Sequence, residues 1–326
     1  MSAASLDGTA ARAAGAGWDD AADAVIAGDL ATALAYATPA GGVVVAPITT
    51  SGVRDREAGT VMLTTSLAFG KKLERIRRAD RVALAFHARE HGFAGGPAFV
   101  LLQGRATVGW TDPAAQGKAL ARGVMRFFGA PKSGRFWSWW MREYYVERLP
   151  VTVAVERVTV WPDPSGESGV TLHGLPAPAA PPDGQAAPKG GVAPRLGARR
   201  AGARLRRLPH LLLGWLGADG FPVVAPVAVG AADRDGLTLL DPTGAVPPGA
   251  RRAGLVGHRF GPGLTALRAQ QHTGWLEVGG SDIRYAPHTQ QRYRTPRGKT
   301  ATLLTNGAQA KRGMRRARRD GTLVAA

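Results

Sequence analysis

A proline-rich segment in the middle of the chain most constrains how this sequence can fold. Residues 162–194 carry eight prolines among many glycines and alanines. Proline lacks the amide hydrogen that helices and central strands need, so such a stretch is typical of a semi-rigid linker. It divides the 326 residues near the middle and leaves enough chain on each side for a domain.

We therefore predict two domains separated by this segment. The expected divisions are a disordered lead-in at 1–17, a first domain at 18–161, a linker at 162–207, a second domain at 208–305 and a basic tail at 306–326.

Short apolar runs separated by glycine-rich turns predict that the first domain is mainly β. Residues 30–37 and 43–49 flank a turn at 39–42, which is the pattern of a hairpin. Further strands are expected at 60–65, 81–88, 98–110 and 151–161, and helices at 18–27, 68–79, 112–128 and 133–148. Because the strands follow one another instead of alternating with helices, a barrel is favoured over a parallel sheet.

The second domain repeats the opening of the first. A strand, a glycine turn and a valine-rich strand carrying Ala-Pro occur in both, with Ala46-Pro47 in one and Ala225-Pro226 in the other. Residues 237–240, 275–278 and 282–285 predict further strands. The repeat indicates a diverged internal duplication.

The composition excludes several classes of site. The chain has no cysteine, so it holds no disulfide, cysteine-ligated zinc, iron–sulfur cluster or thiol nucleophile. His87, Glu90 and His91 have the spacing of metal ligands on a helix, but they follow a predicted strand, and we expect no metal site. The aromatic run 136–145 favours core packing, with the wall of a cofactor pocket as the alternative.

The charge and the N-terminus bear on partners and location. The net charge is +18, and arginines cluster at 195–207 and 311–319. A solvated basic face is the favoured interpretation; nucleic acid or an anionic membrane surface is the alternative. Residues 1–20 lack the apolar core of a signal peptide, and prolines interrupt the apolar stretch 208–232, so we expect a cytoplasmic protein.

Four consecutive motifs suggest a family. They are the hairpin strands at 34–38 and 42–47, the run Val61-Met62-Leu63-Thr64-Thr65-Ser66, and the basic run from Lys71 to Leu84. Their order and spacing resemble the pyridoxamine 5'-phosphate oxidase-like split-barrel superfamily, most closely over residues 30–108. The resemblance implies a mainly β (α+β) fold of two tandem split β-barrel lobes with inserted helices.

The resemblance also implies a cofactor site. Members of the superfamily bind FMN, a deazaflavin or, less often, haem. The positions that would hold the cofactor here are Val45, Pro47 and Thr49 along its ring, and Thr64, Thr65, Ser66, Lys71 and Lys72 at its phosphate. Hydroxyls at a strand end that face a helix start with a lysine suit an anion on physical grounds as well.

The family usually dimerises, so the tandem lobes are expected to form a dimer-like unit within one chain, and a homodimer remains an alternative. Residues 241–248, directly after Leu240, contain no lysine, which predicts a closing role for the second lobe, with Arg251, Arg252, His258 or His272 reaching the first lobe's site. The expected activity is flavin- or deazaflavin-dependent oxidoreduction of a small organic substrate. The alternative is a binding protein without turnover; no catalytic residue is indicated.

Overall fold

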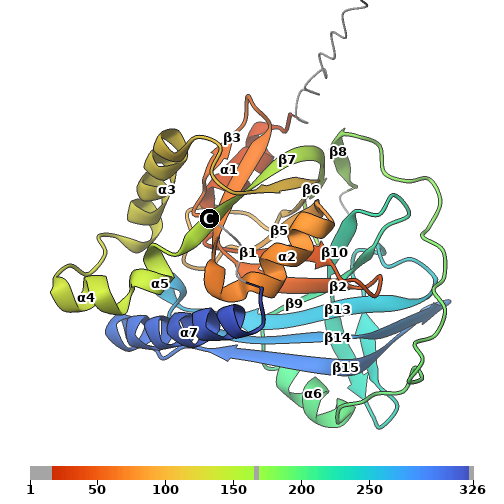
Figure 1. The fold of residues 1–326 in the computed structure, drawn as a ribbon. Coiled ribbons are helices and arrows are strands. Elements are labelled where there is room, and N and C mark those ends of the chain that lie inside the picture. The colour runs from red at the N-terminus through yellow and green to blue at the C-terminus, as the bar shows by residue number, and fades with distance from the viewer. Residues whose placement is uncertain (1–16, 165–168, 323–326) are drawn as a thin grey trace, which may run out of the picture.

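The protein is built on two antiparallel sheets with helices inserted between the strands (Figure 1). A computed structural model describes residues 17–164 and 169–322, so nearly all of the predicted lead-in lies outside the described residues. The predicted class, mainly β with inserted helices in two lobes, is confirmed.

The first lobe forms an eight-stranded sheet in the order β2-β1-β5-β6-β7-β4-β3, with β8 paired to β7. Its strands are β1 (Ala31–Ala37), β2 (Val43–Ile48), β3 (Arg54–Asp55), β4 (Thr60–Ser66), β5 (Arg81–Ala88), β6 (Phe99–Val108), β7 (Arg148–Trp161) and β8 (Thr171–Gly174). Its helices are α1 (Asp20–Gly28), η1 (Leu67–Phe69), α2 (Gly70–Arg78), α3 (Pro113–Phe128), α4 (Arg135–Trp140) and α5 (Arg142–Tyr145).

The second lobe forms a seven-stranded sheet in the order β10-β9-β13-β14-β15-β12-β11. Its strands are β9 (His210–Leu216), β10 (Pro222–Pro226), β11 (Ala228–Ala232), β12 (Leu237–Leu240), β13 (Gly249–Arg259), β14 (Arg268–Gly279) and β15 (Asp282–Arg294). Its helices are α6 (Ala198–Leu205), η2 (Pro262–Leu264) and α7 (Lys299–Arg319).

Apart from β8, the two sheets have the same strand order, so each of the other strands of one lobe has a counterpart in the other. In both lobes a bulge lies opposite a glycine: that of β7 opposite Gly104 of β6, and that of β15 opposite Gly274 of β14. A Cβ at either glycine would lie 2.1 Å from a carbonyl oxygen, that of Ala154 or Ala286. The same backbone irregularity at the same place supports the duplication that the sequence predicts.

The lobes share a small-residue core between their sheets. Ala33, Ala35, Val43 and Val45 of lobe 1 pack with residues of lobe 2 such as Leu212, Val224 and Val256. The backbones approach closely here, because a Cβ on Gly254 of β13 would lie 2.4 Å from the Val43 carbonyl oxygen of β2. Alanine and glycine allow this approach, which bulkier side chains would prevent.

Two equivalent histidines meet at the centre of this interface. Leu84 pairs with Leu34 in lobe 1 and Leu255 pairs with Leu213 in lobe 2, so His87 and His258, three residues later, are counterparts. Their Nε2 atoms lie 2.7 Å apart. Equivalent side chains touch only near an axis that relates the lobes, so the lobes are arranged about an approximate two-fold axis.

The ring nitrogens of this pair have defined roles. His87 Nδ1 lies 3.0 Å from the Ala85 carbonyl oxygen, to which it donates. His87 Nε2 therefore accepts from the Nε2–H of His258, whose Nδ1 is buried without a partner. Burial lowers the pKa of His87 to about 3 and holds that of His258 well below its usual value. Both imidazoles are neutral at neutral pH.

Three segments differ from the sequence expectation. The single helix expected at 133–148 is two short helices, α4 and α5, followed by the start of β7 at Arg148. The aromatic run is not core, because Phe136 and Trp139 are 52% and 61% exposed. Much of the segment expected as a basic tail belongs to α7, which buries Ala310, Met314 and Ala317 against the first lobe.

The proline-rich segment is extended and ties the lobes together. Its β8 adds a strand to the first sheet beside β7. Further along, the Gln185 side chain donates to the Gly41 carbonyl oxygen in lobe 1 and accepts from the Arg252 amide in lobe 2. No helix in the described part of the chain is long and apolar enough to cross a membrane.

We expect Gly254→Ala to destabilise the protein by about 1–3 kcal/mol, because the added Cβ must push β2 and β13 apart. Urea denaturation measures the loss. Gly279→Ala is the matched control, since it lies in the same sheet with no atom within 4 Å of its added Cβ. Equal stability of both variants would contradict the close approach of the two strands.

We expect stability to fall as the pH drops below about 6.5. In the unfolded chain these two histidines bind protons near pH 6.5, whereas in the folded protein the buried His87 and His258 stay neutral until much lower pH. Each therefore lowers the free energy of unfolding by up to about 1.4 kcal/mol per pH unit. Denaturation at a series of pH values should show a shallower slope for His87→Leu/His258→Leu. The exposed His91→Asn should leave the slope unchanged; no difference between these variants would refute the assignment.

Candidate functional site

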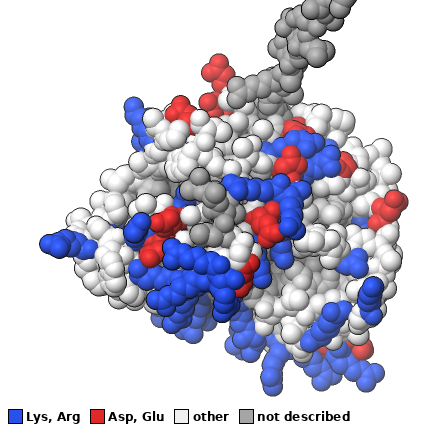
Figure 2. All heavy atoms as spheres, viewed as in Figure 1, with Lys and Arg blue, Asp and Glu red and all other residues white. Residues whose placement is uncertain are grey.

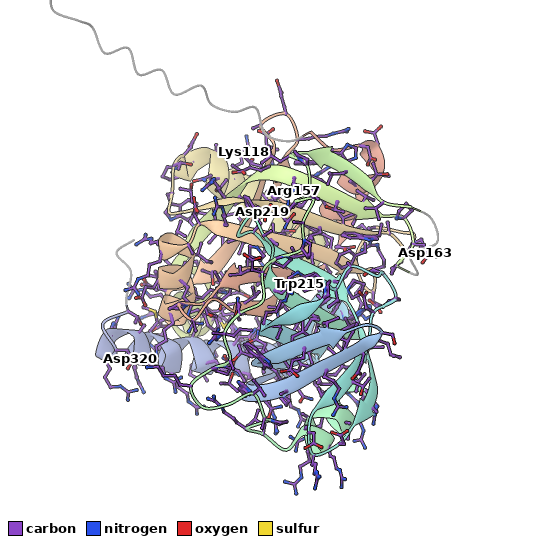
Figure 3. All side chains as sticks on the ribbon, turned by 90° about the vertical axis from the view of Figure 1, so that its right-hand side faces the viewer. Lys118, Arg157, Asp163, Trp215, Asp219 and Asp320 are labelled. Atoms are coloured by element: carbon purple, nitrogen blue, oxygen red, sulfur yellow. The ribbon has the colours of Figure 1, made fainter. Side chains whose placement is uncertain are left out.

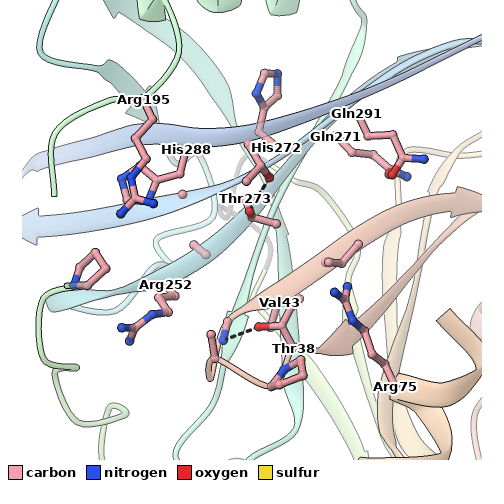
Figure 4. A pocket seen from close by; sticks show the side chains of 18 of the residues that line it. Thr38, Val43, Arg75, Arg195, Arg252, Gln271, His272, Thr273, His288 and Gln291 are labelled. Carbon is pink, nitrogen blue, oxygen red and sulfur yellow. Dashed lines mark hydrogen bonds between the residues drawn. The ribbon is translucent and has the colours of Figure 1, made fainter. Parts of the chain in front are cut away.

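A cavity of about 730 Å³ lies between the two lobes (Figure 4). One wall is the β1–β2 hairpin of lobe 1, including Thr38, Val43 and Val44. The opposite wall comes from β13, β14 and β15 of lobe 2, and residues 188–190 and 195 of the linker close one side. Small-molecule sites commonly have this size and lie between domains.

Cationic side chains stand at both ends of the cavity. Figure 4 shows Arg195 and Arg252 at one end, near His288, and Arg75 at the other end. Lys189 adds a further positive charge, and none of the described residues that line the cavity is acidic. An unbalanced positive lining attracts an anionic ligand.

The two best-placed arginines are held by neighbouring elements. Arg75 lies on α2 near Tyr36 of β1, where burial raises the pKa of the Tyr36 hydroxyl and the charge of Arg75 lowers it. Arg252 stacks over Trp275 at 5.7 Å and donates to Gln185 Oε1 at 3.2 Å. Both guanidinium groups are therefore positioned before any ligand arrives.

Small side chains keep the lobe 2 wall of the cavity open. Thr273 on β14 and Thr289 on β15 share a hydrogen bond of 2.6 Å between their hydroxyls. They stand opposite one another next to the bulge at Gly274. This wall therefore offers hydroxyl groups and a close backbone approach to a ligand.

The equivalent position in the other half of the molecule is filled. By register, Gln103 and Arg157 of lobe 1 are the counterparts of Thr273 and Thr289. Arg157 Nη1 donates to Gln103 Oε1 at 2.9 Å, and Arg157 Nη2 lies 2.7 Å from Asp219 of lobe 2 (Figure 3). Gln103 also donates to the Pro222 carbonyl oxygen. These large polar side chains occupy the space that the threonines leave free, so the equivalent position between the lobes is closed.

The three residues predicted along the cofactor ring do not line the cavity. Val45 faces the interface, where a Cβ on Gly214 would touch it. Pro47 pairs with Ala33 inside the sheet, and the Thr49 hydroxyl accepts from the Ser51 amide. The neighbouring residues Val43 and Val44 of the same strand line the cavity instead.

The five residues predicted around the phosphate cluster at the end of β4, but they too lie outside the cavity lining. Ser66 caps η1, Thr65 is buried, and Lys71 pairs with Asp320 after α7 at 3.8 Å. The Thr64 hydroxyl accepts from Arg148 Nε at 2.9 Å. Their role as phosphate ligands stays a prediction.

Lys72 and Arg148 form a cationic pair beside Thr64. Burial, together with the nearby charge of Arg148, lowers the pKa of Lys72 to about 7. Burial also lowers the pKa of Arg148, whose guanidinium donates to the carbonyl oxygens of Thr64 and Tyr144. No carboxylate in the described part of the chain pairs with the Lys72 ammonium, so an anion here would stabilise its charged form.

Of the lobe 2 residues expected at the site, Arg252 and His272 line the cavity. Burial lowers the pKa of His272 to about 4, so its ring is neutral. Arg251 points to the other face of β13 and is buried, with its guanidinium bonded to the Pro248 carbonyl oxygen. His258 belongs to the interface pair with His87.

Four cationic residues at or near the site were not predicted as site residues from the sequence: Arg75, Lys189, Arg195 and Arg148. Arg75 lies among several arginines of one amphipathic helix, and the sequence did not distinguish it from its solvated neighbours. Lys189 and Arg195 belong to the proline-rich segment, which was expected to be a spacer. Arg148 lies at the end of a segment that the sequence predicts to be helical.

The three imidazoles of His87, His210 and His258 lie close together, but no described group of His, Asp or Glu is arranged to hold a metal ion.

Comparison with known proteins gives matches by fold only. No family model and no curated protein matches the sequence. A conserved hypothetical protein of Mycobacterium tuberculosis is 19% identical with a TM-score of 0.33 over 46% of this chain and 88% of its own. A protein of Clostridium acetobutylicum related to general stress protein 26, of the pyridoxinephosphate oxidase family, is 9% identical with a TM-score of 0.30 over 44% and 84%. An F420 reductase is 15% identical with a TM-score of 0.31 over 42% and 94%.

We expect anion binding at Lys72 to weaken as the pH rises through 7, because its ammonium then loses its proton. Sulfate is a suitable probe, since its own charge is constant over this range. NMR titration of the backbone amides of α2 from pH 6 to 8.5 should show the affinity falling severalfold. Lys72→Gln should remove the pH dependence, and Lys71→Gln, which alters an exposed lysine, should retain it. A pH-independent affinity in the unaltered protein would exclude an anion at Lys72.

Proposed function

We propose that this chain binds a flavin or deazaflavin cofactor between its lobes and uses it in the oxidoreduction of a small organic substrate. The observation that carries the proposal is the cavity of about 730 Å³, which is walled by strands, cationic at both ends and free of acidic lining. The sequence resemblance to the pyridoxamine 5'-phosphate oxidase-like superfamily supports the choice of cofactor class.

The lining of the cavity suits a flat ring system. Val43 and Val44 present apolar backbone and side-chain surface on one side, and Thr273 and Gly274 face them across the cavity. A planar heterocycle placed between them would meet apolar contacts on one face and hydroxyl and peptide groups on the other. This combination of apolar walls with a few polar groups is typical of cofactor sites.

The charges suit a ligand with an anionic tail. Lys72 and Arg75 are three residues apart on α2 and so lie on one side of that helix. We place the phosphate of the cofactor toward this end, where Thr64, Thr65, Ser66, Lys71 and Lys72 are the candidate ligands and Arg75 is added by the cavity. A deazaflavin coenzyme, whose tail continues from the phosphate and carries more negative charge than FMN, would place that charge at the same end and leave Arg195 and Arg252 to the polar edge of the ring. Haem is the less favoured alternative.

When bound, the cofactor supplies the electron transfer, and the chain supplies position and charge. Arg75 and Arg252 orient the ligand, and their charge favours an electron-rich ring. The Thr273 and Thr289 hydroxyls are the groups placed to donate hydrogen bonds to the ring or the substrate. The neutral, buried His272 stands beside them without adding charge.

We expect one cofactor per chain, because Gln103, Arg157 and Asp219 fill the equivalent position in the other half of the molecule. Calorimetric titration with FMN and with a deazaflavin measures this stoichiometry. A value of two would show that the polar side chains move aside and that both halves bind.

We expect Arg75→Ala and Arg252→Ala each to weaken cofactor binding by about 10- to 100-fold, since each removes a charge-assisted hydrogen bond to an anionic ligand. Arg77→Ala is the matched control, because it removes the same charge from an exposed position of the same helix. Equal losses in all three variants would indicate attraction by net charge alone and would refute the site.

Turnover separates an enzyme from a binding protein. A protein that binds the cofactor in the cavity should reduce a small acceptor when a reduced cofactor is supplied, as followed by the cofactor's absorbance. Binding that Arg75→Ala abolishes, without any electron transfer to a panel of acceptors, would establish a cofactor-binding protein and reject the oxidoreductase.

A further inference from the structure

Two helical segments on one side of the molecule carry only positive charge. Residues 113–142 contain six lysines and arginines and no acidic residue. Residues 299–319, which form α7, contain seven and again no acidic residue. Figure 2 shows the basic side chains gathered over α7, with a largely white surface toward α4.

Large apolar side chains are exposed beside these charges. Phe136 and Trp139 of α4 are 52% and 61% exposed, and Met125 of α3 is 51% exposed. The helices α3 and α4 bury none of their residues. A protein with a well-filled core in each lobe has no need to leave such side chains in water, so their exposure indicates a binding surface.

The aromatic and basic groups form one continuous surface. The Trp140 indole donates to the Leu304 carbonyl oxygen of α7, and its ring stacks on Phe136 at 6.1 Å. Lys311 of α7 lies 4.7 Å from the ring of Trp139 and forms an ion pair with Glu143. These contacts fix α4 along the first half of α7.

The exposed face of α7 continues this surface. Leu304, Lys311, Arg312, Arg315 and Arg319 follow a helical spacing that places them on one side, while Leu303, Ala310, Met314 and Ala317 are buried on the other. We call the surface of Phe136, Trp139, Leu304, Arg312, Arg315 and Arg319 the α4–α7 face. Aromatic groups stand at one end of it and arginines at the other.

We propose that the α4–α7 face binds the surface of an anionic lipid bilayer. Tryptophan and phenylalanine favour the interface between headgroups and acyl chains, and arginines on the same surface pair with anionic headgroups. The apolar side of α7 is buried in the protein, so this helix contributes its exposed arginines to the attraction and not an inserted face. The charge of the face complements the bilayer, and the protruding, unburied α4 supplies the apolar groups that enter it.

A nucleic acid would use the arginines equally well, and a single strand would stack its bases on the rings, but it gives no reason for the exposed aliphatic side chains of Met125 and Leu304. The bilayer accounts for both halves of the face. It also requires no change in the fold, since the exposed rings already point outward. The inference is independent of the proposed cofactor.

The test is flotation with vesicles of phosphatidylcholine alone and with added phosphatidylglycerol. The protein should bind the anionic vesicles and not the neutral ones, and binding should weaken as salt is raised from about 0.1 M to about 0.5 M. Phe136→Ser/Trp139→Ser keeps the charge unchanged and should weaken binding by about tenfold or more. Arg312→Glu/Arg315→Glu/Arg319→Glu should weaken it by at least about 100-fold, at roughly fivefold for each positive charge lost and more for reversal.

Arg199→Glu/Arg200→Glu/Arg207→Glu is the matched control, because it makes the same charge change on the exposed residues of and next to α6. Circular dichroism establishes that each variant is folded. Trp139→Phe is a milder change: if Trp139 inserts into the bilayer, this variant should lose the shift in tryptophan fluorescence that vesicles cause in the unaltered protein. Equal loss in the α6 variant, or unchanged binding by the serine variant, would show unspecific attraction by net charge and overturn the proposal. Tighter binding to duplex or single-stranded DNA than to anionic vesicles would also overturn it.

Discussion

Backbone packing of β2 against β13 sets the distance between the two lobes, and most other features depend on it. Gly254 allows the strands to approach until a Cβ would collide with the Val43 carbonyl oxygen, and alanines and valines fill the rest of the interface. This approach brings His87 against its counterpart His258 near the axis. It also places the β1–β2 hairpin opposite β13–β15, which creates the cavity.

The duplicated lobes have diverged in a way that keeps one half open. Thr273 and Thr289 leave space where Gln103 and Arg157 fill it, although the two pairs hold equivalent positions beside the same bulge. The second lobe also passes from β12 to β13 without a helix in the place of α2. One lobe therefore supplies the cationic helix and the other supplies the open wall, and each needs the other to form the site.

The charge of the protein serves separate places in the structure. Arg75, Arg195 and Arg252 line the cavity, and none of the described lining residues is acidic. The arginines of α7 remain on the surface beside exposed aromatic rings. The positive residues behind the net charge of +18 are thus divided between the cavity and the outer surface, and neither place holds all of them.

Local sequence predicted the secondary structure well wherever pattern and propensity agreed. Glycine turns between valine-rich strands located both opening hairpins, and Ala46-Pro47 and Ala225-Pro226 revealed the repeat before the equal strand order did. The aromatic run 136–145 was misread, because apolar composition alone does not tell a buried segment from an exposed one. The basic residues after 305 were similarly taken for a tail, although Met314 and Ala317 anchor them as a helix.

The sequence by itself determined the strands, the duplication, the absence of thiol chemistry and the positive charge, because these follow from local pattern and composition. Only the tertiary structure decided which cations face a ligand. Arg75, Arg195 and Arg252 are 57 to 177 positions apart along the chain, by their residue numbers. They line the same cavity only because β2 packs on β13 and the linker contacts both lobes. Which side of a helix or strand faces the other lobe is set by that packing, and no local pattern contains it.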